Sequence, residues 1–143
     1  MTAFTLDRLV EIHDDVFAPW IKSLRLMPVE IGDGFCLFCL PQNGDLTRRG
    51  GPGGGVICGQ AVSAAADTAS VLALCAANQA LRPCTTVDLT AHFMRPLPEG
   101  DVDIRVEILS NGRRMAVTRA EFRAAGSKKL AATVTCAFAY LDL

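Results

Sequence analysis

The sequence predicts an α+β domain in which an antiparallel sheet curls around one long, buried helix. Residues 57–80 are rich in alanine and leucine and contain one charged side chain, Asp67, which indicates a helix without a charged face. The chain that follows alternates between apolar and polar residues with a period of two, which indicates strands. Because a helix of this kind must be surrounded by protein, we expect the sheet to wrap around it.

The size and composition of the chain fit one domain. It has 143 residues, half of them apolar, which is enough for a continuous core without disulfides or metals. We expect a single domain over residues 1–143, with an N-terminal helix in 1–22 and the core in 24–143. A net charge of −1 argues against nucleic-acid binding, and no polybasic run would hold the chain on an anionic membrane.

The N-terminus lacks a basic segment followed by an apolar stretch, so it does not resemble a secretory signal. No apolar run approaches the roughly 18 to 20 residues of a membrane span. We therefore expect a cytoplasmic protein with neither nucleic-acid nor membrane partners.

The six cysteines are scattered among apolar residues, which predicts reduced, buried thiols. The one close pair, Cys36 and Cys39, lies in a predicted strand, where residues three apart point to opposite faces. No second Cys/His pair completes a set of four ligands. We expect no metal site and no cofactor.

The first half of the chain is predicted to contain a helix over residues 5–20 and one strand or a strand-turn-strand over residues 27–31 and 35–40. A long glycine-rich loop is predicted over residues 41–55. Thr5 is a plausible N-cap of the helix, and Pro19 a plausible stop. Because a long loop is unusual in a compact domain, this one is expected to have a functional role.

Four strands, beginning near residues 87, 102, 115 and 130, are predicted in the second half as an antiparallel meander. Asn111-Gly112 is a strong hairpin signal between the second and third of them. Five strands from one chain would cover only part of the helix. We therefore expect two copies to pair edge to edge as a homodimer, which pairs further into a tetramer.

Three motifs resemble those of the hotdog-fold acyl-CoA thioesterases, and among them the phenylacetate-degradation-type thioesterases. Residues 54–69, GGVICGQAVSAAADTA, resemble the family's central-helix signature, in which His-Gly-Gly or a Ser-Gly-Pro variant precedes an apolar stretch ending in Leu-Ala-Asp-Thr-Ala. Residues 86–96 are similar to the family's strand ending in Phe-Leu-Arg-Pro, and residues 111–117 to its Gly-Arg-Arg hairpin. The motifs are ordered and spaced as in the family from about Leu24 to the C-terminus.

The resemblance implies a hotdog fold and the hydrolysis of an acyl-CoA thioester to the free acid and CoA. Asp67 matches the family's catalytic acid, as general base or nucleophile. Gly59, eight residues earlier, matches the glycine whose backbone N–H polarises the thioester carbonyl. A hydroxyl of Thr86 or Ser63 would position the nucleophilic water.

The chain departs from the family pattern beside Gly59. Cys58 and Gln60 stand where the more common variant has His and the second Gly, and Gly51-Pro52-Gly53 stands where an Asn often precedes the motif. These departures imply altered substrate handling or reduced activity. The residues expected to contact the substrate or its CoA phosphates are Cys58, Gln60, Arg95, Arg113 and Arg114.

The residue chemistry also allows other functions. A carboxylate in an apolar helix can serve as base or nucleophile, and the free N–H groups at a helix start can stabilise an oxyanion. The same carboxylate could instead be hydrogen-bonded across an interface in a module that binds acyl-CoA or another apolar ligand without turnover. A hydratase or dehydratase pairs His with an acid, but His92 is expected to point away from the helix, opposite Val87 and Phe93.

Overall fold

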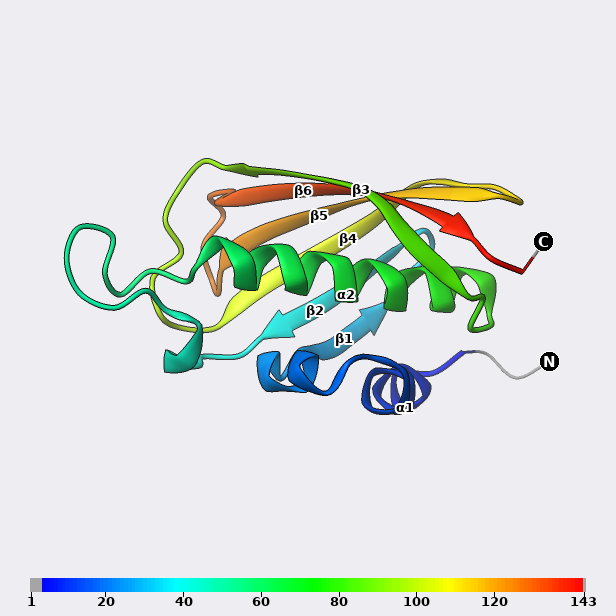
Figure 1. Cartoon of the computed structure of the whole chain (residues 1–143), viewed down its shortest axis with the longest axis horizontal. Helices are drawn as coiled ribbons and strands as arrows, with labels where there is room; N and C mark the ends of the chain where they lie inside the picture. The colour runs from blue at the N-terminus through cyan, green and yellow to red at the C-terminus, as the bar shows by residue number, and fades with distance from the viewer. Residues whose placement is uncertain (1–3, 143) are drawn as a thin grey trace.

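Six strands form one antiparallel sheet that curls around α2 in the computed structural model, which describes residues 4–142 (Figure 1). The expected domain limits at residues 1 and 143 lie outside the described residues. The helices are α1 (Leu6–Val16), η1 (Pro19–Leu24), η2 (Gly44–Leu46) and α2 (Gly59–Asn78). The strands are β1 (Met27–Ile31), β2 (Phe35–Leu40), β3 (Cys84–Phe93), β4 (Val102–Asn111), β5 (Met115–Ala124) and β6 (Ala132–Tyr140). This arrangement is the hotdog fold that the sequence predicts.

The strand order is β1-β2-β4-β5-β6-β3, and every neighbouring pair is antiparallel. The four C-terminal strands therefore do not form the expected meander, because β3 pairs with β6 at the edge of the sheet rather than with β4. Period-two alternation identifies a strand but carries no information about its pairing partner. The hairpin signal at Asn111-Gly112 is confirmed, since β4 and β5 pair on either side of it.

The α2 helix runs across the inner face of the sheet and contacts all six strands. It begins after the N-cap Cys58 and ends at Gln79, whose left-handed backbone (φ 53°) directs its N–H to the carbonyls of Ala76 and Cys75. Its length and hydropathy would suit a membrane span, contrary to the expectation from the sequence, but 67% of that stretch is buried inside this domain.

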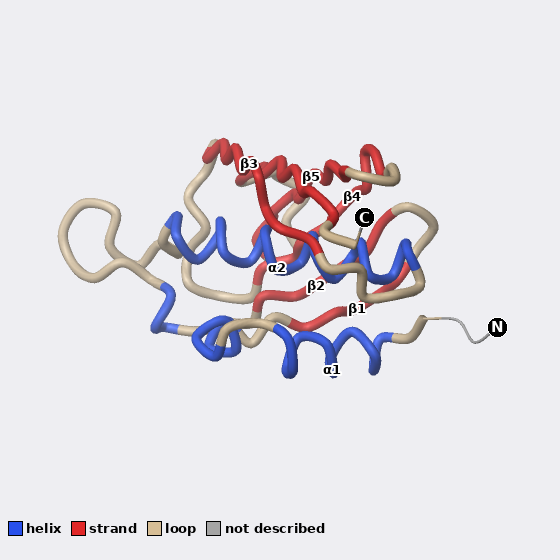
Figure 2. Tube along the Cα trace, turned by 45° about the vertical axis from the view of Figure 1, so that its right-hand side comes forward, coloured by secondary structure: helices blue, strands red, loops and turns tan. Residues whose placement is uncertain are grey.

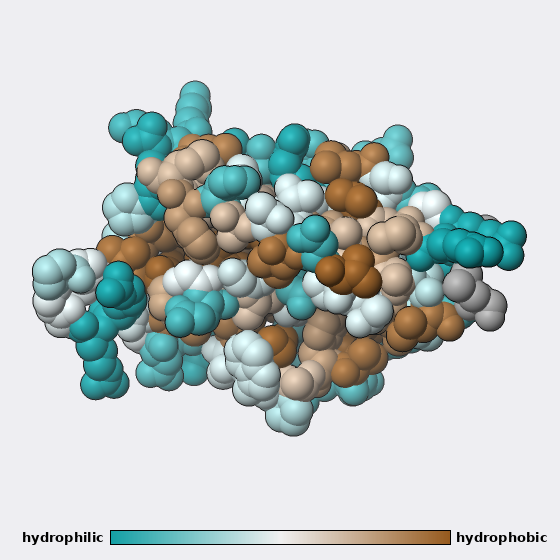
Figure 3. All heavy atoms as spheres, turned by 45° about the horizontal axis from the view of Figure 1, so that its top comes forward, coloured by the Kyte–Doolittle hydropathy of each residue, from teal (hydrophilic) through white to brown (hydrophobic). Residues whose placement is uncertain are grey.

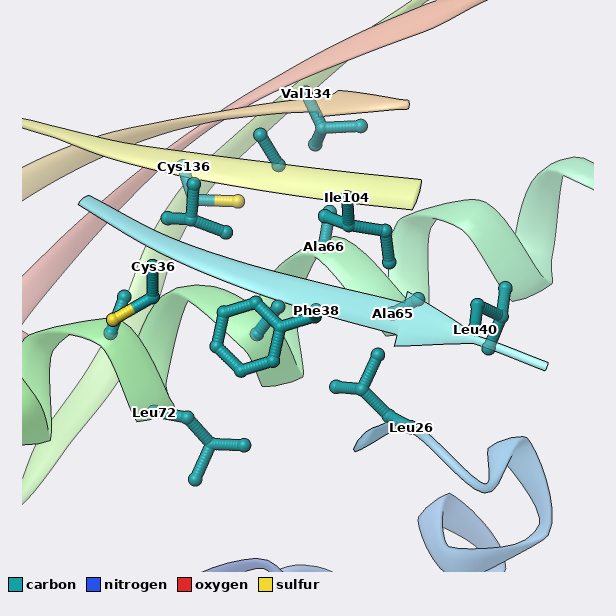
Figure 4. Close-up of a cluster of buried hydrophobic side chains, with 14 of the residues drawn as sticks. Leu26, Cys36, Phe38, Leu40, Ala65, Ala66, Leu72, Ile104, Val134 and Cys136 are labelled. Carbon is teal, nitrogen blue, oxygen red and sulfur yellow. The ribbon is translucent and has the colours of Figure 1, made fainter. Parts of the chain in front are cut away.

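Buried alanines of α2 let the sheet approach the helix closely. Ala65 and Ala66 are fully buried and lie with Leu72 of α2 against Phe38 of β2 and Ile104 of β4 (Figure 4). Because alanine has no side-chain entropy to lose and little bulk, the larger residues of the strands can fill the space beside it.

The α1 helix lies against α2 and β1 (Figure 2). The Thr5 hydroxyl caps it by accepting a hydrogen bond from the N–H of Arg8, as expected for an N-cap. Leu9 and Ile12 are buried beneath it, whereas Val16 at its last position is half exposed (51%). The end of α1 is therefore held close to α2 with apolar side chains at its surface.

The β3 strand is an edge strand with little buried surface. Val87 and Phe93 were expected to face the helix, but their side chains are 52% and 56% exposed. The register shifts between Thr86 and Asp88, and no strand in the described residues covers the outer edge of β3. His92 is exposed, as the alternation predicts.

All six cysteines are free thiols. Cys36, Cys75 and Cys136 are buried, and this burial raises the thiol pKa from 9.0 to about 11, 12 and 11, respectively. Their behaviour as small apolar core residues agrees with the prediction from the sequence.

We predict that Leu72→Ala lowers the free energy of unfolding by about 2–5 kcal/mol, because Leu72 is fully buried and the substitution leaves a cavity. The matched control is Leu141→Ala, at a side chain that is 62% exposed, which should change it by less than about 0.5 kcal/mol. Urea unfolding followed by circular dichroism measures both. Equal losses in the two variants would contradict the packing described for α2.

Iodoacetamide at pH 8 should alkylate the half-buried Cys58 of the native protein far faster than Cys136. A pKa near 11 instead of 9.0 reduces the thiolate fraction of Cys136 at this pH about 100-fold, and burial blocks access as well. Peptide mass spectrometry reads the modification at each position, and urea should make all six thiols reactive. Equal labelling of the two cysteines without urea would contradict the prediction.

Candidate functional site

A glycine-rich loop leads the chain into α2 at one end of the molecule (Figure 1). Its base is closed by hydrogen bonds from the N–H of Arg48 to the Val56 carbonyl (2.8 Å) and from the N–H of Gly55 to the Arg48 carbonyl (2.9 Å). Gly53 and Gly55 have φ of 81° and 76°, conformations that favour glycine. The base of the loop is therefore a closed turn that leads directly into the start of α2.

Gly59 is the first residue of α2, and its N–H has no backbone or side-chain acceptor within the described part of the chain. A free N–H at this position can bind a negatively charged oxygen. Phe93, at the end of β3, lies directly over it: a Cβ built on Gly59 would be 3.3 Å from Phe93 Cζ. Both residues line a hollow of about 380 Å³, together with Arg48 and Arg95.

Asp67 lies about two turns further along α2 and is half-buried. The Thr86 hydroxyl of β3 donates a hydrogen bond of 2.6 Å to Asp67 Oδ1. Among the described residues, no side chain or backbone group donates to Oδ2. Asp67 and Thr86 line a second hollow, of about 480 Å³, whose other residues are mostly apolar. The structure therefore brings these two predicted site residues together as a fixed carboxylate with one free oxygen.

Gly59 and Asp67 do not share a hollow within one chain. Eight residues along a helix correspond to about 12 Å, which is too far for both to act on one carbonyl group. Gly59 lies beneath the Phe93 end of β3, and Asp67 lies beside its Thr86 end. One chain thus has two separate hollows, near opposite ends of its edge strand.

Ser63 does not join Asp67 in its hollow. It lies one turn earlier on α2, is half-buried, and lines neither hollow. Ser63 and Asp67 are four residues apart and so share a face of α2, but the hollow extends from Asp67 toward Val71 and the C-terminal end of the helix rather than toward Ser63. Of the two hydroxyls expected near the carboxylate, the structure places only Thr86 there.

The residues that flank Gly59 have different surroundings. Cys58 is half-buried at the N-cap, its side chain makes no capping hydrogen bond, and its N–H donates to the Leu46 carbonyl at 2.8 Å. Gln60 is exposed.

Of the three arginines expected to bind the substrate, one lines a hollow and two lie on an exposed turn. Arg95 lines the Gly59 hollow. Arg113 and Arg114 are exposed on the β4–β5 turn, where the Arg113 carbonyl accepts a hydrogen bond of 2.8 Å from Arg82 Nη2. Arg82 in turn lines the Asp67 hollow, so this turn lies beside it.

Two site features were not predicted from the sequence. Phe93 was expected in the core but covers Gly59, and Phe17, at the end of α1, lines the Asp67 hollow. Both contacts join segments distant in the chain, so no local pattern could have indicated them. Within residues 4–142, no group of three or more His, Cys, Asp or Glu side chains is placed to hold a metal ion.

An antiparallel sheet curled around a long central helix is the hotdog fold. Residues 43–139, more than half of the chain, match the family model described as the acyl-CoA thioesterase N-terminal domain. The chain belongs to this family. A search of curated proteins found no match.

Solved structures from several organisms resemble the whole fold. A conserved protein from Pseudomonas aeruginosa is 29% identical with a TM-score of 0.76, over 90% of this chain and 98% of that chain. A mutant phenylacetic acid degradation protein from Thermus thermophilus is 25% identical with a TM-score of 0.71, over 87% and 100%. A thioesterase from Haemophilus influenzae is 20% identical, with a TM-score of 0.83 over 98% and 92%, and so shows the fold alone.

Proposed function

We propose that this protein hydrolyses an acyl-CoA thioester to the free acid and CoA, with Asp67 as the working carboxylate. The observation that carries the proposal is the Asp67 carboxylate, held by Thr86 at one oxygen and open to a largely apolar hollow at the other. Membership of the acyl-CoA thioesterase family supports the reaction class. The proposal assigns Asp67 the role of general base or nucleophile.

In the base-catalysed form, Asp67 takes a proton from water while the water oxygen bonds to the acyl carbon. The carbonyl oxygen becomes negative and accepts a hydrogen bond from the N–H of Gly59 in a second copy of the chain. The tetrahedral intermediate then expels the CoA sulfur, which receives the proton from Asp67. In the nucleophilic form, Asp67 attacks the acyl carbon and the C–S bond breaks, so that the CoA thiolate leaves and a mixed anhydride remains. Water then hydrolyses the anhydride, which frees the acid, restores the Asp67 carboxylate and supplies the proton that the CoA sulfur takes up. Thr86 acts as a positioning residue in both, since its hydroxyl contacts the carboxylate.

We assign the complete site to a homodimer. A ten-residue edge strand with exposed apolar side chains is prone to pair with another strand, and β3 has such residues in Val87 and Phe93. On the face turned forward in Figure 3, apolar side chains lie across the middle and hydrophilic ones gather toward both ends. Antiparallel pairing of two β3 strands about a two-fold axis sets the Thr86 end of one beside the Phe93 end of the other.

This pairing joins the Asp67 hollow of one chain to the Gly59 hollow of the second copy, so the acid and the oxyanion donor meet across the interface. Arg48 and Arg95, which line the Gly59 hollow, are then available for the CoA phosphates. Cys58 and Gln60 lie beside the same hollow's glycine and would contact the thioester end of CoA. A further pairing of dimers into a tetramer completes the proposed assembly.

Asp67→Asn should lower kcat/KM at least about 100-fold, because the amide neither accepts the proton of water nor attacks the thioester. The measurement of kcat/KM is free-thiol release from short, medium, long and aromatic acyl-CoAs. Thr86→Ser is the control, because serine keeps a hydroxyl that can donate a hydrogen bond to Asp67. If the wild type binds acyl-CoA but releases no thiol from any substrate, the protein is a non-catalytic binding module instead.

Gly59→Pro should lower kcat about 100-fold or more, because proline removes the N–H that stabilises the oxyanion. Proline is favoured at the first position of a helix, and Cys58 already has the extended conformation that precedes proline (φ −69°, ψ 151°). Gly59→Ala is the matched control: it adds the same Cβ beside Phe93 but keeps the N–H. Equal losses of kcat in both variants would mean that the added Cβ crowds Phe93 and that the N–H is not responsible.

The two variants together test whether the site is shared between chains. A heterodimer of Asp67→Asn and Gly59→Pro chains, purified through two different tags, has one doubly altered site and one intact site if the site is shared. Its activity should be about half that of the wild-type dimer. A heterodimer as inactive as either mutant homodimer would place both residues of a site in one chain.

A further inference from the structure

The hollow beside Asp67 continues past the carboxylate toward the C-terminal end of α2. Val71, one turn after Asp67, lines it next, followed by Leu81 and Pro83 of the connection from α2 to β3. Its volume of about 480 Å³ lies within the range of small-molecule sites. If Asp67 acts on the thioester, as proposed above, the acyl group has this space in front of it.

The end of α1 forms a side wall of the hollow. Val16 and Phe17 contribute to its lining. The centroid of the Phe17 ring lies 5.9 Å from that of His13, a buried residue of α1. Val16 is 51% exposed and Leu81 38% exposed, which is unusual exposure for large apolar side chains gathered in one concavity. Such a wall gains stability when an apolar ligand covers it.

Among the described residues that line the hollow, one side chain is cationic, and its charge is already paired. Arg82 lines the hollow, but Arg82 Nε and Nη2 donate to the two oxygens of Asp142 at 2.8 and 3.0 Å. Its guanidinium also lies 3.5 Å from the Tyr140 ring centroid, and Nη2 donates to the Arg113 carbonyl. The hydrogen bond from Arg82 holds the pKa of Asp142 below its usual value, so the pair stays charged and mutually neutralised.

We infer that the Asp67 hollow holds an uncharged, apolar acyl group, and that Phe17 and Leu81 are specificity-determining residues that limit its length. An acyl group ending in a carboxylate would place that charge against apolar side chains and an arginine already paired with Asp142. A longer apolar group would meet Leu81 and Phe17. The substrate class is therefore alkanoyl or aryl thioesters without a terminal charge.

The first test compares hexanoyl-CoA with adipoyl-CoA, which has the same number of carbons and a terminal carboxylate. Hexanoyl-CoA should have a kcat/KM at least about tenfold higher, since a buried unpaired carboxylate is costly. Equal or better hydrolysis of adipoyl-CoA would overturn the inferred substrate class while leaving the thioesterase function intact.

The second test changes the walls. Phe17→Ala and Leu81→Ala should each raise the ratio of kcat/KM for long over short alkanoyl-CoAs at least about fivefold, and Leu81→Trp should lower it. Trp20→Ala and Leu141→Ala are matched controls, because both side chains are largely exposed (63% and 62%) and lie outside the hollow. Ratios that stay within twofold of the wild type in all three wall variants would overturn the role of Phe17 and Leu81.

A binding measurement separates this inference from the proposed function. Alkyl-CoA thioethers of increasing chain length are not hydrolysed, and calorimetry gives their Kd for the wild type and for the same variants. If the wild type releases no thiol from any acyl-CoA, the thioesterase function fails. The inference on the hollow still stands if Leu81→Trp raises the Kd of the longer thioethers only. It fails if the Kd values of the longer thioethers do not change.

Discussion

The burial of α2 is the constraint on which the rest of the structure depends. A mostly apolar helix of twenty residues is unstable if it faces water. The sheet curls around this helix, and every strand contacts it. The fully buried alanines allow that close approach, because they leave room for the larger residues of the strands. A straight sheet would leave part of the helix uncovered, so the curl of the fold follows from the composition of one segment.

The same constraint makes Asp67 exceptional. A carboxylate on an apolar helix is costly to desolvate unless something hydrogen-bonds to it, and Thr86 does so from β3. The strand that hydrogen-bonds to the carboxylate, β3, is also the strand with an uncovered edge. The candidate site and the proposed dimer contact therefore both involve β3. In the proposed dimer, chemistry and assembly are coupled through β3 because it is the edge strand, paired on one side with β6.

Much of the fold and part of the site were predictable because they depend on local patterns. The cap at Thr5, the hairpin at Asn111-Gly112 and the extent of the central helix follow from residues within a few positions of one another. The pairing of β3 with β6 was mispredicted, and Val87 and Phe93 proved exposed, because alternation along a strand cannot report whether a further strand covers its edge. Ser63 lies one turn from Asp67 but outside its hollow, because the packing of distant segments decides which part of the helix face the hollow follows.

The sequence by itself determined the class of fold, the single acid on the central helix and the glycine eight residues before it, because helix composition and motif spacing are properties of a continuous segment. The family resemblance predicted Thr86 near that acid, but only the tertiary structure decided the full set of groups around it. Thr86 comes from β3, Phe17 from the end of α1 and Leu81 from the connection after α2, and these segments are brought together by burial of the helix. Contacts between distant segments arise from the packing of the whole chain, so no local pattern records them.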